Sequence, residues 1–336
     1  MVKWSANSHE SLESAEKELI ALSGVEIEPM RIYFDVPESF SIFCLKCGDP
    51  SNPPMFLLHG YLGTSIIFYK LLKHLTSRYY VYCLDLMGMG RSSRPEFVAK
   101  TPEEAEHFFI IPLELCRDKL GVDKMVLAGH SFGGYIAGCY TESFPSRVHK
   151  LVLISSIGVP RPPGDVSPEE WSRSLNWKFR GFMKFARYLM KKNITPASIL
   201  RKFGPFSGRL IRGYLKRRWS GVPEEDLEHL KVYLEQVNLY PGSGEFALAQ
   251  LFVEGAFAIK PLYERIACTP TVFIYGDRDW MDPVGAEMNS KVNQCQVICE
   301  IISRSGHHMY IDNPEELGDK MIQALDRLEQ PIAVTH

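Results

Sequence analysis

The chain has 336 residues, which is enough for one large α/β domain with an insertion or for two smaller domains. Its formal net charge of −2 argues against a nucleic-acid-binding surface that spans the whole chain. The first residues lack the apolar core of a secretory signal, and no run approaches the roughly 18 apolar residues of a membrane span. We therefore expect a cytoplasmic protein.

The eight cysteines are scattered along the chain, and several fall in predicted strands. Cys44 and Cys47 form a C-x-x-C pair, but no second pair at suitable spacing completes a zinc site. Buried thiols in a reducing compartment are therefore favoured over disulfides, and no metal is expected.

The predicted elements alternate between strands and helices. An amphipathic helix is expected over residues 8–23, and another helix begins at Thr101-Pro102-Glu103-Glu104, which reads as a capping box with proline at the first helical position. Short apolar runs that alternate with helical patterns indicate a parallel sheet buried on both faces. The strand-like runs cover residues 31–36, 40–46, 55–60, 78–90, 124–130, 150–156, 270–276 and 296–303.

The alternation stops after Ser156, and from there to about Ala258 the sequence reads as turns and helices. We expect a helical lid inserted after the sixth strand, because ligands of open α/β sheets bind beyond the carboxyl ends of the strands. The predicted organisation is an N-terminal helical extension (1–28), a first core segment (29–158), a basic lid (159–262) and a second core segment (263–336).

Gly129-His130-Ser131-Phe132-Gly133 is a G-x-S-x-G motif placed between a strand run and a helical run. This is the context of a nucleophile elbow, a sharp strand-to-helix turn that exposes a serine hydroxyl. Ser131 is therefore the predicted nucleophile.

A serine nucleophile needs a base and an acid, which follow it in the order acid, then histidine. The strand-end loop after Gly276 contains Asp277, Asp279 and Asp282, and a later loop contains His307 and His308. We favour His307, because His308 would point the opposite way on an extended backbone. Asp279 has the usual spacing from Gly276, and Asp282 stays as the alternative acid.

The oxyanion of an acyl-transfer intermediate needs two backbone N–H donors. We expect them from Tyr61, which follows the strand-end His59-Gly60, and from Phe132, directly after the nucleophile.

The lid is strongly basic. Residues 173–218 contain fourteen Lys and Arg and no Asp or Glu. Lys184, Arg187 and Lys191 lie about a quarter turn of helix from an apolar arc, which favours contact with an anionic membrane or with lipid headgroups. The alternative is a lid helix packed on its apolar side with a solvated basic face. The apolar arc consists of Phe179, Phe182, Met183, Ala186, Leu189 and Met190.

The segments "LLHGYLG", "LDLMGMGRSSRP", "GHSFGGY" and "GHHMYIDNPEE" resemble the α/β-hydrolase-domain 4/5 subfamily, and the likeness extends through the lid. The resemblance implies an α/β-hydrolase fold with Ser131 as nucleophile and His307 as base. Its plant-like pattern puts the acid at Asp279 and its animal pattern at Asp282. His307 and Asp312 match an H-x4-D signature associated with acyl transfer, although Asp312 also suits a cap of the last helix.

Members of this subfamily include lipases, acyltransferases and a lipid-droplet coactivator of a triacylglycerol lipase, which has asparagine at the position of Ser131. The favoured function is a serine hydrolase or acyltransferase of (lyso)phospholipids in lipid homeostasis, such as a lysophosphatidic acid acyltransferase. Acyl-CoA would be its co-substrate, and no other cofactor is expected. The alternatives are a non-catalytic coactivator with a lipase partner and a generic cytosolic carboxylesterase. We expect peripheral association with membranes or lipid droplets and no nucleic-acid partner.

Overall fold

Eight strands form one mixed sheet in the computed structural model, which describes residues 9–34, 40–163, 166–203, 206–219, 222–253 and 257–328. Their order is β1-β2-β4-β3-β5-β6-β7-β8. The β1–β2 and β2–β4 pairs are antiparallel, and the others are parallel. The strands are β1 (Ile27–Phe34), β2 (Phe40–Cys47), β3 (Pro54–Leu58), β4 (Tyr80–Leu84), β5 (Met125–His130), β6 (Val148–Ile154), β7 (Thr271–Gly276) and β8 (Val297–Ile302).

Each predicted strand run overlaps one of these strands, but two runs differ from it at one end by four residues or more. The run 78–90 extends six residues beyond β4, which ends at Leu84, because the chain turns at Gly88 and Gly90, both with positive φ. The other difference is at the start of β1. That strand begins at Ile27, four residues before the predicted run, because pairing with β2 already starts at Ile27 opposite Cys47. Residues 35–36 of the predicted run lie outside the described residues. All six residues of β5 and of β7 are buried, as a sheet covered on both faces requires.

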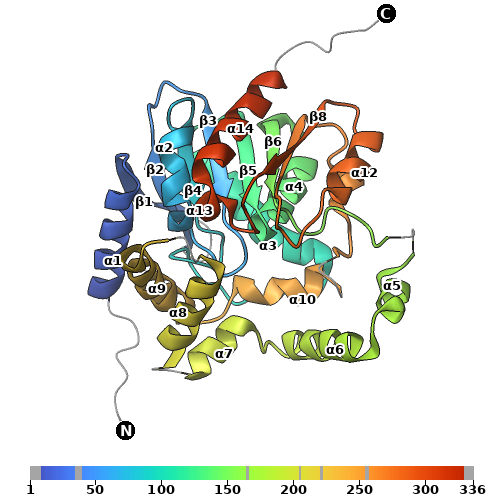
Figure 1. Cartoon of the computed structure of the whole chain (residues 1–336). Coiled ribbons are helices and arrows are strands. Elements are labelled where there is room, and N and C mark those ends of the chain that lie inside the picture. The colour runs from blue at the N-terminus through green and yellow to red at the C-terminus, as the bar shows by residue number, and fades with distance from the viewer. Residues whose placement is uncertain are drawn as a thin grey trace, which may run out of the picture.

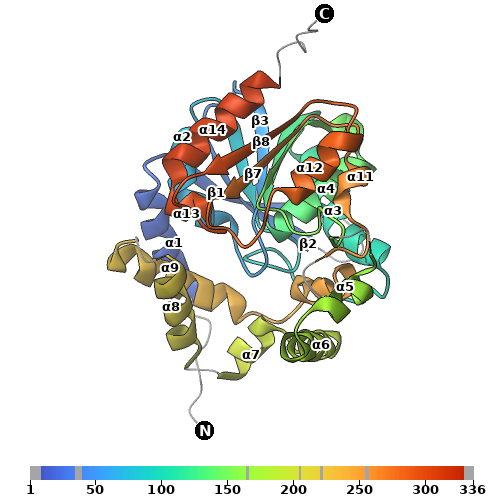
Figure 2. The same ribbon diagram turned by 45° about the vertical axis from the view of Figure 1, so that its right-hand side comes forward.

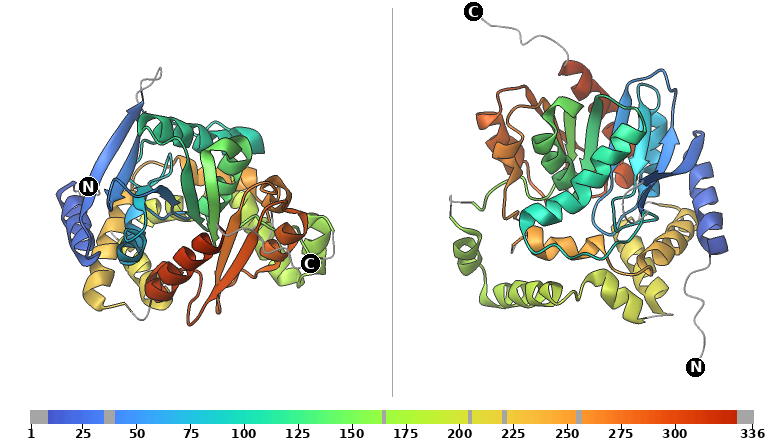
Figure 3. Two further views of the ribbon diagram at one scale, coloured as in Figure 1. Left: turned by 90° about the horizontal axis from the view of Figure 1, so that it is seen from above. Right: turned by 180° about the vertical axis from the view of Figure 1, so that it is seen from behind.

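The two faces of the sheet bury separate hydrophobic clusters. Leu57 belongs to the cluster under α1, α2 and α14, whereas its neighbours Phe56 and Leu58 belong to the cluster under α3, α4 and α12. Figure 3 shows these helix layers from above and from behind. The helices of this core are α1 (His9–Leu22), α2 (Tyr69–Leu75), α3 (Pro102–Lys119), α4 (Phe132–Ser143), α12 (Val284–Val292), α13 (Met309–Asp312) and α14 (Pro314–Arg327).

Local signals in the sequence set two further features of the core. The Glu104 amide donates to Thr101 at 3.2 Å and the Thr101 amide donates to the Glu104 carboxylate at 3.3 Å, which is the predicted capping box. Cys44 and Cys47 are buried in β2 as free thiols.

The expected helical insertion lies between β6 and β7. In Figure 1 its helices run across the lower end of the sheet, and Figure 2 shows α6 nearly end-on at the edge of the molecule. The helices of the lid region are α5 (Pro168–Ser174), α6 (Trp177–Lys191), α7 (Pro196–Phe203), α8 (Ser207–Arg218), α9 (Glu224–Asn238), α10 (Leu248–Leu251) and α11 (Leu262–Arg265).

Helix α9 is fixed to the core by the polar contacts of Arg94. The guanidinium of Arg94, in the loop after β4, donates to the core carbonyls of Gly88 and Gly90, both at 3.1 Å. It also donates to the carbonyls of Val237 at 2.8 Å and Pro241 at 3.0 Å, at the end of α9. On its other side α9 packs against α1 (Figure 1).

Candidate active site

Ser131 lies at a strained turn between β5 and α4. Its backbone has φ 53° and ψ −114°, in a region that residues with a side chain rarely adopt. The flanking glycines are sterically required, because a Cβ on Gly129 would lie 2.3 Å from the Gly133 carbonyl oxygen and one on Gly133 would lie 2.4 Å from the His59 carbonyl oxygen. The turn therefore holds the Ser131 hydroxyl above the end of the sheet.

Three side chains from three strand ends meet at this turn. The Nε2 atom of His307 lies 3.0 Å from Ser131 Oγ, and its Nδ1 atom lies 3.1 Å from Asp279 Oδ1. Asp279 follows β7 and is fully buried, and His307 follows β8 with a side chain that is 10% exposed. Nucleophile, base and orienting acid are thus within hydrogen-bonding reach of one another.

The other predicted acids have different contacts. Asp282 is exposed and accepts a hydrogen bond from the Val284 amide at 3.1 Å, at the start of α12. Asp277 accepts from the Ser305 amide at 2.9 Å and so links the two loops that carry Asp279 and His307. Neither is bonded to His307, so the geometry favours Asp279 as the acid.

The site contains a second serine that the sequence analysis missed. Ser155, just after β6, donates its hydroxyl proton to Asp279 Oδ2, and its oxygen lies 2.7 Å from His307 Nδ1. Burial by itself would raise the pKa of Asp279, but the hydrogen bonds from His307, Ser155 and the Met281 amide lower it below the ordinary value. Ser155 thus helps to keep Asp279 ionised, which holds the proton of His307 on Nδ1 and leaves Nε2 free to accept from Ser131.

His130, the variable residue of the G-x-S-x-G motif, positions the base. Its Nε2–H donates to the backbone carbonyl of His307 at 2.8 Å, and the two rings are 4.7 Å apart. Burial and the adjacent His307 and His308 rings hold the pKa of His130 well below its ordinary range, so the ring is neutral. No sequence motif singled out this contact, because it depends on how two distant loops meet.

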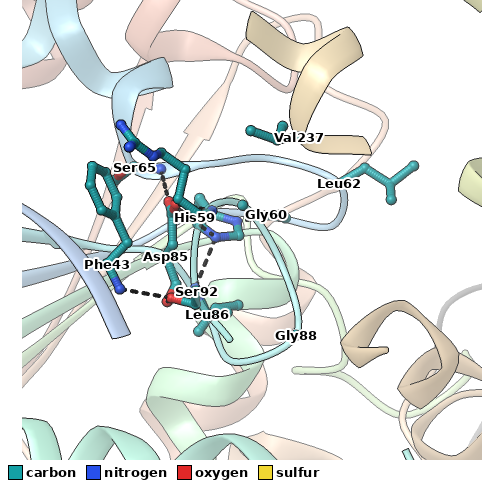
Figure 4. Close-up of polar contacts among 12 residues, drawn as sticks. Phe43, His59, Gly60, Leu62, Ser65, Asp85, Leu86, Gly88, Ser92 and Val237 are labelled. Carbon is teal, nitrogen blue, oxygen red and sulfur yellow. Dashed lines mark hydrogen bonds and ion pairs between the residues drawn. The ribbon is translucent and has the colours of Figure 1, made fainter. Parts of the chain in front are cut away.

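A buried network supports the expected oxyanion site (Figure 4). The Leu86 amide donates to His59 Nε2 at 3.0 Å, which places the His59 proton on Nδ1, from where it donates to the Gly60 carbonyl at 2.8 Å. This contact fixes the Gly60–Tyr61 peptide, which carries the Tyr61 amide. A Cβ on Gly60 would lie 3.1 Å from Ser131 Cβ, so this peptide is next to the nucleophile.

The carboxylate of Asp85 links the two loops that form the same network. Its buried carboxylate accepts from the amides of Ser65 at 2.5 Å and Arg91 at 2.7 Å, which ties the loop after β3 to the loop after β4. The second expected donor, the amide of Phe132, is the first in helix α4 and therefore has no partner within the helix. Both predicted amides are thus held beside Ser131.

Asp312 does not line the cavity at Ser131. Its Oδ2 atom accepts a hydrogen bond from the Gly306 amide at 2.9 Å, directly before His307. The suggested capping role is wrong, because Asn313 is the N-cap of α14 and accepts from the Glu316 amide. Asp312 instead holds the loop that presents His307.

Ser131 and His307 open onto a cavity of about 680 Å³ between the core and the lid. Tyr61 and Trp280 contribute to it from the core, and Arg218 from the end of α8. Arg218 is the only Lys or Arg that lines this cavity in the part of the chain that the structure describes. The largest group of lining residues is aliphatic and consists of Leu62, Ile67, Ile199, Leu200, Leu210, Ile211 and Leu234.

The basic residues proposed for headgroup contact lie elsewhere, on α6. Lys184 and Lys191 are exposed and Arg187 is half-buried, and none of them lines the cavity. The apolar arc of α6 is only partly covered, since Phe182 is 65% exposed and Met183, Ala186, Leu189 and Met190 are half-buried. The side chain of Phe179 lies outside the described set. Three further aromatics of α6 are exposed: Trp177 (68%), Phe185 (59%) and Tyr188 (58%).

Comparison with known proteins identifies the fold and relatives. Residues 53–314 match the family model of the alpha/beta hydrolase fold. The 1-acylglycerol-3-phosphate O-acyltransferase of Arabidopsis thaliana is 36% identical over 78% of this chain and 64% of its own length. The 1-acylglycerol-3-phosphate O-acyltransferase ABHD5 of Homo sapiens is 32% identical over 83% of this chain and 79% of its own. The (lyso)-N-acylphosphatidylethanolamine lipase of Homo sapiens is 29% identical over 84% and 82%, respectively.

Solved structures agree on the architecture. A membrane phospholipase A described as a bacterial virulence factor superposes with a TM-score of 0.68 at 23% identity, covering 95% of this chain and 92% of its own. Carboxylesterase CesB of Bacillus subtilis gives 0.64 at 19% identity, covering 94% and 98%. The predicted fold and the family resemblance are confirmed.

The burial of His308 predicts a loss of stability in mild acid. Burial, with the charges of His307 and Arg218, lowers the pKa of His308 to about 3, whereas a histidine in the unfolded chain has a pKa of about 6.5. At a pH below the unfolded pKa and above the folded pKa, the unfolded chain binds a proton that the folded chain does not, so the free energy of unfolding falls as pH falls. Replacing His308 with Asn should reduce the loss between pH 7.5 and 5.5 by about 1.4 kcal/mol.

Urea unfolding at the two pH values measures this difference. His107→Asn, at an exposed position of α3, is the control and should leave the difference unchanged. An equal pH dependence in wild type and His308→Asn would contradict the prediction.

Proposed function

Because the chain belongs to the α/β-hydrolase family, we propose that it is a serine-nucleophile hydrolase or acyltransferase that acts on (lyso)phospholipids. The observation that carries the proposal is the continuous hydrogen-bonded path from Ser131 through His307 to Asp279, beside a largely apolar cavity. The aliphatic side chains that line that cavity, and the names of the acyltransferase and lipase relatives, support a lipid substrate.

In the first half-reaction Ser131 Oγ attacks the acyl carbonyl carbon while His307 Nε2 takes the hydroxyl proton. Asp279 stabilises the resulting imidazolium, and Ser155 supports the Asp279 carboxylate. The Tyr61 and Phe132 amides donate to the oxyanion. When the tetrahedral intermediate collapses, the bond to the leaving alcohol or thiol breaks and His307 returns the proton to it.

In the second half-reaction the Ser131 ester is cleaved by an acceptor. His307 takes a proton from water, which gives a free fatty acid, or from a lysophosphatidic acid hydroxyl, which gives phosphatidic acid. With acyl-CoA as donor the leaving group of the first step is the CoA thiol. Hydrolysis and transfer use the same groups and differ in which acceptor reaches the acyl-enzyme.

Helix α6 fits peripheral binding to an anionic lipid surface. Its exposed Trp177, Phe182 and Phe185 lie beside the exposed Lys184 and Lys191, a combination typical of helices that lie in a membrane interface. Among the described residues, no helix combines the length and hydropathy needed to cross a bilayer. The proposed approach to substrate is therefore from a membrane or droplet surface.

Ser131→Ala should abolish product formation. Wild type and variant are incubated with lysophosphatidic acid and labelled oleoyl-CoA, and the products are resolved by mass spectrometry. Labelled phosphatidic acid or labelled oleate should form at least about 10³-fold more slowly with the variant, because the acyl-enzyme cannot form.

Ser290→Ala, at an exposed position of α12, is the matched control. Equal product from wild type and Ser131→Ala would refute the nucleophile. No product from either protein would favour the coactivator alternative, in which the protein stimulates a triacylglycerol lipase regardless of Ser131.

Replacing each of the two candidate acids with asparagine should have clearly different effects on kcat. Asp279→Asn should lower kcat by about 10³- to 10⁴-fold, because the amide no longer selects the correct tautomer of His307. Asp282→Asn should change kcat less than about threefold, because Asp282 contacts only the start of α12. Steady-state hydrolysis of a soluble ester checks both values, and a reversed order would identify Asp282 as the acid.

The membrane proposal predicts that both components of the α6 surface contribute. Trp177, Phe182 and Phe185 replaced together by Ala should weaken binding to anionic liposomes at least about tenfold, through lost apolar burial. Lys184→Glu combined with Lys191→Glu should also weaken binding to anionic liposomes, and by a larger factor at low salt than at high salt.

Sedimentation with liposomes measures both effects. Lys124→Glu with Lys291→Glu, at exposed positions outside the lid, is the charge-matched control. Sedimentation that neither set of α6 substitutions changes would rule out this surface as the contact.

A further inference from the structure

Arg218 differs from the other basic residues of α8 in its surroundings. Arg212 and Lys216 bind the Glu224 carboxylate at 2.5 and 2.9 Å. Arg218 lines the Ser131 cavity, and no described carboxylate forms an ion pair with it. Since Arg218 is also exposed, it lies where the cavity meets solvent. An unpaired guanidinium at the mouth of a largely apolar cavity fits an anionic group on an otherwise apolar ligand.

We propose that Arg218 binds the phosphate of the lipid substrate while the acyl chain occupies the aliphatic cavity and the ester reaches Ser131. The inference rests on the proposed function, to which it adds the residue that selects phosphate-bearing substrates. It also separates two roles within the basic lid. The exposed cations of α6 contact a surface, and Arg218 contacts the individual substrate molecule.

The position of Arg218 is coupled to the loop of the catalytic base. Its neighbour Trp219 is 3% exposed, and its ring packs edge-on against His308 with a centroid distance of 5.5 Å. His308 directly follows His307, so the phosphate site and the base are joined through one packed contact. This arrangement fixes how far the phosphate lies from the acyl carbonyl, which a substrate with a short glycerol spacer requires.

Three other polar side chains lie around Arg218. Tyr214 lies one helical turn before Arg218 and also lines the cavity. Burial is the main cause of the shifted pKa values of His308, Asp312 and Tyr214, and the charge of Arg218 is a further cause for all three. Arg218 is therefore near each of them. The Asp312 carboxylate accepts a hydrogen bond from the Gly306 amide and forms no ion pair with Arg218 among the described residues.

A binding measurement tests the inference without turnover. An ether-linked alkyl glycerol 3-phosphate, which has no cleavable ester, and the same alkyl glycerol without phosphate are titrated into wild type, Arg218→Gln and Arg218→Lys. Arg218→Gln should weaken binding of the phosphate compound about 10- to 100-fold and that of the neutral compound less than about threefold. Arg218→Lys should fall between wild type and Arg218→Gln. Arg209→Gln, at an exposed position of α8 that does not line the cavity, should bind both like wild type.

Equal losses for the two compounds would assign Arg218 a structural role, and no loss for either would remove it from the substrate site; each result overturns the inference. Because the phosphate could belong to the lysolipid or to acyl-CoA, oleoyl-CoA and a neutral oleoyl thioester are titrated in parallel. A selective loss for oleoyl-CoA alone would also overturn the inference, because Arg218 would then bind the acyl donor and not the phosphate of the lysolipid. Failure of the Ser131 experiment with intact phosphate selectivity would reject the catalytic proposal and leave the phosphate site standing.

Discussion

The left-handed backbone at Ser131 is the constraint on which the rest of the site depends. A serine held at φ 53° costs about 1–3 kcal/mol, and it persists only because the surrounding packing allows no alternative. That packing brings the β5–α4 turn so close to the end of β3 and the loop after it that Gly60 and Gly133 have no room for a side chain, and the turn itself is so tight that Gly129 has none either. The same closeness brings the nucleophile within reach of groups from four other strand ends.

Those groups depend on one another because they share a nearly dry space. The buried Asp279 carboxylate is kept ionised by donors from His307, Ser155 and the Met281 amide. His307 is in turn held by His130 on its carbonyl and, through the Gly306 amide, by Asp312. Asp312 thus has a clear structural role within the H-x4-D signature, which is to support the loop of the base and not to contact the cavity.

The sequence predicted what local signals determine. The strands, the capping box at Thr101, the elbow and the order of the triad follow from short apolar runs, glycines and spacing. Ser155 could not be identified, since "LISS" gives no sign of which serine turns inward. Arg218 was one of fourteen cations, and only the packing of α8 separates it from them. A helical wheel gave the two arcs of α6 but not how much of the apolar arc the protein covers.

The contacts of Arg94 attach one part of the lid firmly to the core. One guanidinium joins two carbonyls of the core loop to two at the end of α9, and its burial lowers its pKa to about 10, which still leaves it charged. Because α1 packs against its other side, α9 is held to the core from two sides. Helix α8 packs against α9 and meets His308 through Trp219, so α7 is the helix of the cavity wall with the fewest contacts to this fixed part. Entry of a lipid past α7 would therefore leave the hydrogen bonds among Ser131, His307 and Asp279 intact.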